Sequence, residues 1–305
     1  MSRRLVLPLL VPIIWVSLTA ATTPTPDAIQ RWHAREVRVQ SIARRILASN
    51  LQACAVKQKD YGFNAISINV AAPANVQAAW TKALQLGDGY TVVTAFPDSP
   101  AQNVGLRIGD ALISVNGAQW SDGKSEQDAF RDALAKGLLA PQLHLTVRRA
   151  KQEIPLDLAG QDICKADAVL RTSRHSNAQA IGSTIVVDAG LEELLTNDDE
   201  LAFIIAHEAA HIFLGHSAPD QQQALKSSAT RSAMEKAADV LGIRLAARAG
   251  YMPEAAAVAN PKLANANRGP ISRLLDLHGP YMSNRDRTEF LKAQAAEVRA
   301  EGLVH

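Results

Sequence analysis

Features that would place a chain in several common classes are scarce in this sequence of 305 residues. After the first 21 residues, no apolar run approaches the roughly 18 residues of a membrane-spanning helix. The formal net charge of +2 gives no reason to expect nucleic acid or another polyanion as a partner. Aromatic residues make up only 5% of the chain while 47% of it is hydrophobic, so we expect alanine-rich helices that pack closely. The length allows two domains with separate cores.

Cysteine is also scarce, with only Cys54 and Cys164. Neither has the spacing of a metal or redox motif, which leaves either one disulfide, as in an oxidising compartment, or two buried thiols. The N-terminus agrees with export, because Arg3 and Arg4 precede an apolar run, and residues 1–21 end in small residues suited to signal peptidase. We expect a periplasmic or otherwise extracytoplasmic protein, with residues 1–21 either removed as a signal peptide or kept as a membrane anchor.

The chemistry of the chain is concentrated in the stretch His207-Glu208-Ala209-Ala210-His211. Apolar residues recur at helical spacing across 201–212, Asn197 offers a cap and Gly215 a stop, which together predict a helix of about four turns. Residues four apart share one face of a helix. Both imidazoles can therefore bind one metal ion while the carboxylate of Glu208 reaches the water on it. The alternative is a surface helix with two solvated histidines.

A catalytic zinc ion needs a third protein ligand and one open position for water. Glu235 is the best candidate, because a second helical pattern carries Glu235 and Asp239 one turn apart. Glu235 would bind the metal, and Asp239 would accept a hydrogen bond from a ligand imidazole. On its own, this pair is more typical of a solvated helix face. His216 would point away from the face of His207 on a continuing helix, so we expect it to cap the helix end.

These two segments resemble the HtpX and CAAX-prenyl endopeptidase family of gluzincin metallopeptidases, in which an HExxH helix is followed by an ExxAD helix. The resemblance covers roughly residues 165–295. It implies one zinc ion per chain, held by His207, His211 and Glu235, with Glu208 as the general base of an endopeptidase.

The family's C-terminal motif, a His-Pro pair followed by an Arg, aligns ambiguously with this chain. His278, Tyr281 and Arg287 are therefore alternative candidates for binding the substrate carbonyl or the developing oxyanion. The alternative for Arg287 is that it merely lies at the start of a surface helix.

Residues 60–160 have an organisation of their own, and the stretch SPAQNVGLRIGDALISVNG resembles part of a PDZ domain. Its glycines mark turns that need unusual backbone angles, and Asn116-Gly117 favours a tight hairpin. The resemblance implies a small β-barrel in which Tyr61, Gly62 and Phe63 hold the C-terminal carboxylate of a peptide beside an open strand edge. The alternative is a module that serves only as a spacer or gate.

The sequence thus predicts an α+β protein. Residues 27–56 would form the first helix of the peptidase domain, residues 60–160 an inserted PDZ-like β-barrel, and residues 165–305 a mainly helical zinc-metallopeptidase domain with a small β-sheet. A disulfide between the two cysteines would tie the neck of the insertion. We expect an exported endopeptidase in protein quality control that acts on misfolded or envelope proteins, in the neighbourhood of the membrane and without nucleic acid. The alternatives are a PDZ-bearing chaperone or adaptor with a latent metal site, and an aminopeptidase on short peptides.

Overall fold

The computed structural model describes residues 24–121, 123–218, 227–267 and 282–303, which form two compact units. The first unit contains residues 24–37 and 58–162, and the second contains residues 38–57 and 163–303. Helix α1 (Pro26–Ser49) begins in the first unit and ends in the second. Within the described ranges, none of the helices combines the length and the apolar character needed to cross a membrane. The expected signal at residues 1–21 lies outside the described residues.

The first unit is an antiparallel sheet with a helix packed against it. Its elements are β2 (Phe63–Ser67), α2 (Ile68–Ala71), α3 (Gln77–Leu84), β3 (Tyr90–Ala95), α4 (Pro100–Asn103), β4 (Ala111–Val115), β5 (Ala118–Gln119), α5 (Lys124–Gly137), β6 (Gln142–Arg149) and β7 (Gln152–Ala159). The strand order is β2-β3-β4-β6-β7, with β5 paired to β4. Buried Tyr90, Phe130 and Leu143 belong to its core. The expected β-barrel is wrong, because β2 and β7 are separate edges and the sheet of the described residues stays open.

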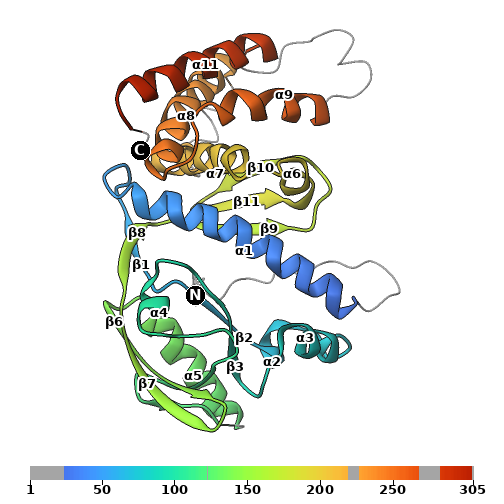
Figure 1. The fold of residues 1–305 in the computed structure, drawn as a ribbon, viewed down its shortest axis with the longest axis vertical. Coiled ribbons are helices and arrows are strands. Elements are labelled where there is room, and N and C mark those ends of the chain that lie inside the picture. The colour runs from blue at the N-terminus through green and yellow to red at the C-terminus, as the bar shows by residue number, and fades with distance from the viewer. Residues whose placement is uncertain (1–23, 122, 219–226, 268–281, 304–305) are drawn as a thin grey trace. The chain divides into compact units, whose positions relative to one another are not determined.

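The second unit packs helices on a three-stranded sheet (Figure 1). Its elements are β9 (Asp167–Arg171), β10 (Ala178–Ile181), β11 (Thr184–Asp188), α6 (Ala189–Leu194), α7 (Asp198–Phe213), α8 (Ser228–Arg248), α9 (Ala255–Asn267) and α11 (Asn284–Ala300). The strand order is β10-β11-β9, with β11 antiparallel to β10 and parallel to β9. Helix α7 contacts β10 and β11 as well as α8 and α9, which makes it the central element of this unit.

The sequence of α7 suits this central position. Ten of its 16 residues are buried, as expected for a helix that is covered on most sides. Its start is fixed by Asn197, whose side-chain oxygen accepts a hydrogen bond of 2.7 Å from the backbone N–H of Asp199. Helix α8 approaches α7 closely at Gly242, where an added Cβ would lie only 2.9 Å from the Cα of His207. The missing side chain at Gly242 therefore sets the separation of the two helices.

Cys54 and Cys164 form a disulfide with a Cα–Cα distance of 5.7 Å. Both belong to the second unit, and the 110 positions that separate them include residues 58–162 of the first unit. Next to the disulfide, β1 (Lys57–Asp60) pairs with β8 (Gln161–Cys164). The bond therefore lies where the chain leaves the second unit and returns to it.

Candidate metal centre

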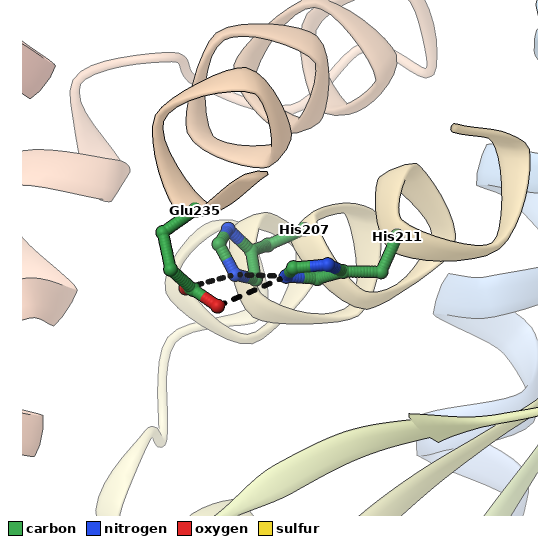
Figure 2. A group of neighbouring side chains, drawn as sticks. All are labelled: His207, His211 and Glu235. Atoms are coloured by element: carbon green, nitrogen blue, oxygen red, sulfur yellow. Dashed lines mark hydrogen bonds and ion pairs between the residues drawn. The ribbon is translucent and has the colours of Figure 1, made fainter. Parts of the chain in front are cut away.

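Three side chains of the second unit converge: His207 and His211 from α7, and Glu235 from α8 (Figure 2). The Nε2 atoms of the two imidazoles are 3.1 Å apart. Glu235 places Oε2 3.4 Å from Nε2 of His207 and Oε1 3.6 Å from Nε2 of His211. Ligand atoms about 2.0–2.2 Å from a tetrahedral zinc ion are about 3.3–3.6 Å apart. The three donors therefore fit three corners of a zinc site, and two histidines with one glutamate form a donor set used by catalytic zinc.

A fully buried carboxylate orients the first of these ligands. Asp239, one turn after Glu235 on α8, places Oδ1 3.0 Å from Nδ1 of His207. Arg287 of α11 binds the same carboxylate with two hydrogen bonds, from Nε to Oδ2 at 2.9 Å and from an Nη to Oδ1 at 2.7 Å. Burial raises the pKa of Asp239, but the hydrogen bonds from His207 and Arg287 outweigh it, so the pKa lies below its usual value. Asp239 is thus held as an anion behind the ligand.

The two imidazoles have opposite pKa shifts in the metal-free protein. Burial lowers the pKa of His207, but hydrogen bonds with Asp239 and Glu235 outweigh it and raise the pKa to about 10. For His211, burial and the positive charge of His207 lower the pKa to about 4. At neutral pH His207 is therefore the imidazolium and His211 the neutral ring, so the pair carries one proton more than two neutral rings, and an incoming metal ion has to displace it.

Glu208 follows the first ligand on α7 and lies at the same cavity. Burial raises the pKa of its carboxyl, and the nearby charge of Glu235 adds to this rise, while His207 and a hydrogen bond from the backbone N–H of Ala180 oppose it. A carboxylate with a raised pKa is suited to accept a proton near neutral pH. The bond from Ala180 ties this side chain to the edge strand β10.

A cavity of about 460 Å³ opens onto these groups. One wall is the segment from Ser176 to Ala180, which includes the start of β10, and Arg287 also borders the cavity. Because β10 is the edge strand of its sheet within the described residues, its outer backbone groups are open to pairing with an extended chain, apart from the N–H of Ala180 that donates to Glu208. The cavity therefore brings a metal site, a candidate base and a strand edge together.

His216 does not point away from the site as expected. Its backbone N–H does cap the end of α7, donating to the carbonyl of His211 at 2.8 Å. Its side chain, however, turns back, and its Nδ1 lies 3.0 Å from Nδ1 of His211. His216 would point away only on a continuing helix, but α7 ends at Phe213 and Gly215 adopts a φ of 74°, which reverses the chain.

The remaining predicted site residues fall into different places. Arg287 lies on Asp239 rather than over the convergence of the three donors, and His278 and Tyr281 lie outside the described residues. In the first unit, the hydroxyl of Tyr61 donates to the carbonyl of Ala140 at 2.6 Å. Sequence reasoning missed the contacts of His216 and Ala180. An HExxH helix that ends at a glycine followed by histidine was the available signal for the former.

The predicted carboxylate loop of the first unit is partly occupied by its own chain. The backbone N–H of Gly62 donates to Asp60 at 3.2 Å, and Asp60 also accepts a hydrogen bond of 2.9 Å from Gln161. Phe63 lies opposite Ala95 of β3 in a pair that is not hydrogen-bonded, because the hydrogen bond next to it runs from the N–H of Phe96 to the carbonyl of Gly62. Its backbone N–H and C=O therefore face the open side of β2.

Two histidines one turn apart, a glutamate donor from the next helix and a carboxylate beside the first ligand are the features of a metallopeptidase-type centre. In agreement, residues 139–230 match the family model for Peptidase family M48, a family of zinc metallopeptidases. The match includes the HEAAH motif and ends before Glu235, so it indicates a metallopeptidase without covering the third donor.

Other comparisons concern shorter parts of the chain. A stretch of 75 residues is 31% identical to "Serine protease HTRA1" of Xenopus tropicalis; it makes up 25% of this chain and 15% of that protein. Among solved structures, the HtrA3 PDZ domain bound to a phage-derived ligand matches 36% of this chain and 91% of its own, with 23% identity and a TM-score of 0.25. The HtrA-type protease AlgW with a decapeptide matches 34% of this chain and 29% of its own, with 20% identity and a TM-score of 0.23.

Proposed function

We propose that this chain is an exported, zinc-dependent endopeptidase of the HtpX and CAAX-prenyl endopeptidase type that cleaves misfolded or envelope proteins. The observation that carries the proposal is the convergence of His207, His211 and Glu235, whose nearest donor atoms are 3.1–3.6 Å apart, beside the partly buried side chain of Glu208. The match to Peptidase family M48 supports the class of enzyme. The disulfide and the signal-like residues 1–21 support a place outside the cytoplasm.

Zinc, when bound, supplies polarisation of the scissile carbonyl and a lowered pKa of the attacking water. Glu208 has the position and the raised pKa to accept the water proton and deliver it to the leaving amine. The N–H of Ala180 keeps its carboxylate directed at the cavity. An extended substrate would pair with the outer backbone groups of β10 that the bond to Glu208 leaves open, and so lie across the cavity.

The PDZ-like unit would recruit substrates or gate their access. Support comes from the open edge of β2, where Phe63 turns its backbone N–H and C=O outward. The adjoining loop supports carboxylate binding less well, because Asp60 already accepts from the N–H of Gly62 and would repel a second anion. We therefore give the strand edge the main role in recruitment and the C-terminal carboxylate a minor one.

The test is cleavage of unfolded casein by the purified full chain loaded with zinc. We expect Glu208→Gln to lower kcat/KM by about 10²–10⁴-fold while the protein still binds one zinc ion. Glu193→Gln, at an exposed position on α6, is the matched control and should behave as the wild type.

Three other outcomes would overturn parts of the proposal. Unchanged cleavage by Glu208→Gln would remove Glu208 as the base. A wild-type protein that binds zinc and unfolded casein but cuts nothing would be the adaptor or chaperone. Release of single residues from short peptides with free N-termini alone would identify an aminopeptidase. Fractionation and N-terminal sequencing of the protein from cells test export and removal of residues 1–21.

A further inference from the structure

Each histidine that binds a metal ion through one nitrogen has a second nitrogen that needs a partner. The Nε2 atoms of His207 and His211 face each other and Glu235, so in the binding form the hydrogen of each neutral ring is on Nδ1. For His207 the group beside Nδ1 is the carboxylate of Asp239, 3.0 Å away. For His211 the corresponding atom is Nδ1 of His216, also 3.0 Å away, with the ring planes at 63°.

We propose that His216 is the positioning residue of His211, and that its Nδ1 accepts the hydrogen of His211 Nδ1 and thereby keeps Nε2 free for the metal. This inference rests on the proposed function, in which His211 is a zinc ligand. His216 itself then carries its hydrogen on Nε2, because its Nδ1 has to act as the acceptor. Its Nδ1 is not a fourth ligand atom, since it meets His211 on the side opposite to the converging donors.

The fold explains how a residue outside the helix reaches this position. Helix α7 ends at Phe213, Gly215 has a φ of 74°, and the N–H of His216 closes the helix end on the carbonyl of His211. This backbone bond brings His216 back over the last turn, directly beside the ring of His211. A hydroxyl of Ser217 bonded to the carbonyl of Gly182 at 2.8 Å anchors the next residue to the β10–β11 turn. The position of His216 is therefore held from both sides.

The two ligands consequently have different supports. His207 contacts the carboxylate of Asp239, which is fully buried and bound by Arg287. His211 instead contacts the neutral ring of His216, which is partly exposed at the cavity. A neutral acceptor orients an imidazole without adding a further negative charge to a site that already contains Glu208, Glu235 and Asp239. The neutral partner thus fixes geometry, while the anionic partner also raises the basicity of its ligand.

The test measures zinc affinity of the metal-free full chain by competition with a chelating dye at pH 8. His216→Leu removes the acceptor and should weaken zinc binding by about 10–100-fold. His216→Asn keeps an oxygen near the position of Nδ1 and should restore the affinity to within about threefold of the wild type. His144→Leu, at an exposed histidine of the first unit, is the control and should bind zinc normally. Thermal unfolding of the metal-free variants checks that each is folded.

A second measurement reports the tautomer directly. In protein with ¹⁵N-labelled histidine, His211 should be protonated on Nδ1 in zinc-loaded wild type and His216 on Nε2. Equal zinc affinity of His216→Leu and wild type, equal weakness of His216→Asn and His216→Leu, or a hydrogen on Nδ1 of His216 would each overturn the proposal. If the wild type and every variant bind no zinc, the proposed function fails and this inference with it. Normal zinc binding and cleavage by His216→Leu would overturn the inference alone.

Discussion

Replacing Arg287 by methionine removes both hydrogen bonds to Asp239 while keeping a long apolar side chain. The carboxylate of Asp239 is fully buried, so the substitution removes one partner of a buried ion pair and leaves the charge of the other behind. Such changes cost about 3–5 kcal/mol. Arg287 is about a quarter exposed and His207 stays beside Asp239, which places the expected loss of folding stability near the lower end, at about 3 kcal/mol.

The same change should weaken zinc binding by about 10–100-fold, because an unsupported Asp239 orients His207 less firmly. Arg287 also borders the cavity, so direct contact with substrate is the competing explanation. A double-mutant cycle separates the two. If Arg287 acts through Asp239, then Arg287→Met should have less than about 0.5 kcal/mol of further effect on zinc affinity in an Asp239→Asn background.

Zinc affinity by dye competition and kcat/KM on unfolded casein are measured for wild type, both single variants and the double variant. Arg285→Met, an exposed neighbour on α11, is the control and should change neither quantity. The reasoning is refuted if Arg287→Met lowers kcat/KM by the same factor in both backgrounds and leaves zinc affinity unchanged. Arg287 would then bind the substrate or its transition state, as the family resemblance allowed.

Three other predictions follow from the structure. With the pKa of His207 raised to about 10 and that of His211 lowered to about 4, zinc binding at pH 7 should release about one proton, and zinc affinity should rise with pH up to about 10. Calorimetry in buffers of different ionisation enthalpy measures the number of protons released. A release of no proton, or of about two, would contradict the prediction. Gly242→Ala should push α8 from α7 and weaken zinc binding at least about tenfold, measured by dye competition, whereas undiminished affinity would show that the helices need no such close approach. Changing Cys54 and Cys164 to serine should lower the free energy of unfolding, measured by urea titration, by about 2–4 kcal/mol. The chain-entropy model gives roughly 5 kcal/mol for a separation of 110 positions, and measured losses are usually smaller. An unchanged free energy of unfolding would mean that the folded first unit already restrains the chain.

The part of the site that depends on local geometry was readable from the sequence. His207 and His211 are one turn apart on any helix, and the helix itself follows from its apolar spacing, its cap at Asn197 and its end at Gly215. The helix with Glu235 and Asp239 could be predicted for the same reason, because two carboxylates four residues apart lie on the same face of any helix. Local helical periodicity was therefore enough to predict which residues are the candidate metal donors.

The parts that depend on contacts between distant segments were not readable. Arg287 meets Asp239 across 48 positions, and no spacing rule links them. The open sheet of the first unit depends on whether β2 and β7 meet, which the strand patterns do not determine. The prediction for His216 failed for a different reason. The end of the helix at Gly215 was recognised, but the direction of the next side chain depends on the left-handed turn at this glycine, where helical spacing no longer applies.

The distribution of these groups links metal binding to folding of the second unit. The donors come from α7 and α8, their hydrogen-bond partners from α8, the turn after α7 and α11, and the contact to Glu208 from β10. No single helix contains a complete site, so the arrangement exists only when these elements are packed together. An ion that binds this arrangement and not the unfolded chain stabilises it by RT ln(1 + [Zn]/Kd), about 4 kcal/mol at a thousandfold excess over Kd. A chelator should therefore lower the unfolding temperature of the second unit, and the shift should shrink in every variant that disturbs one of the supporting contacts.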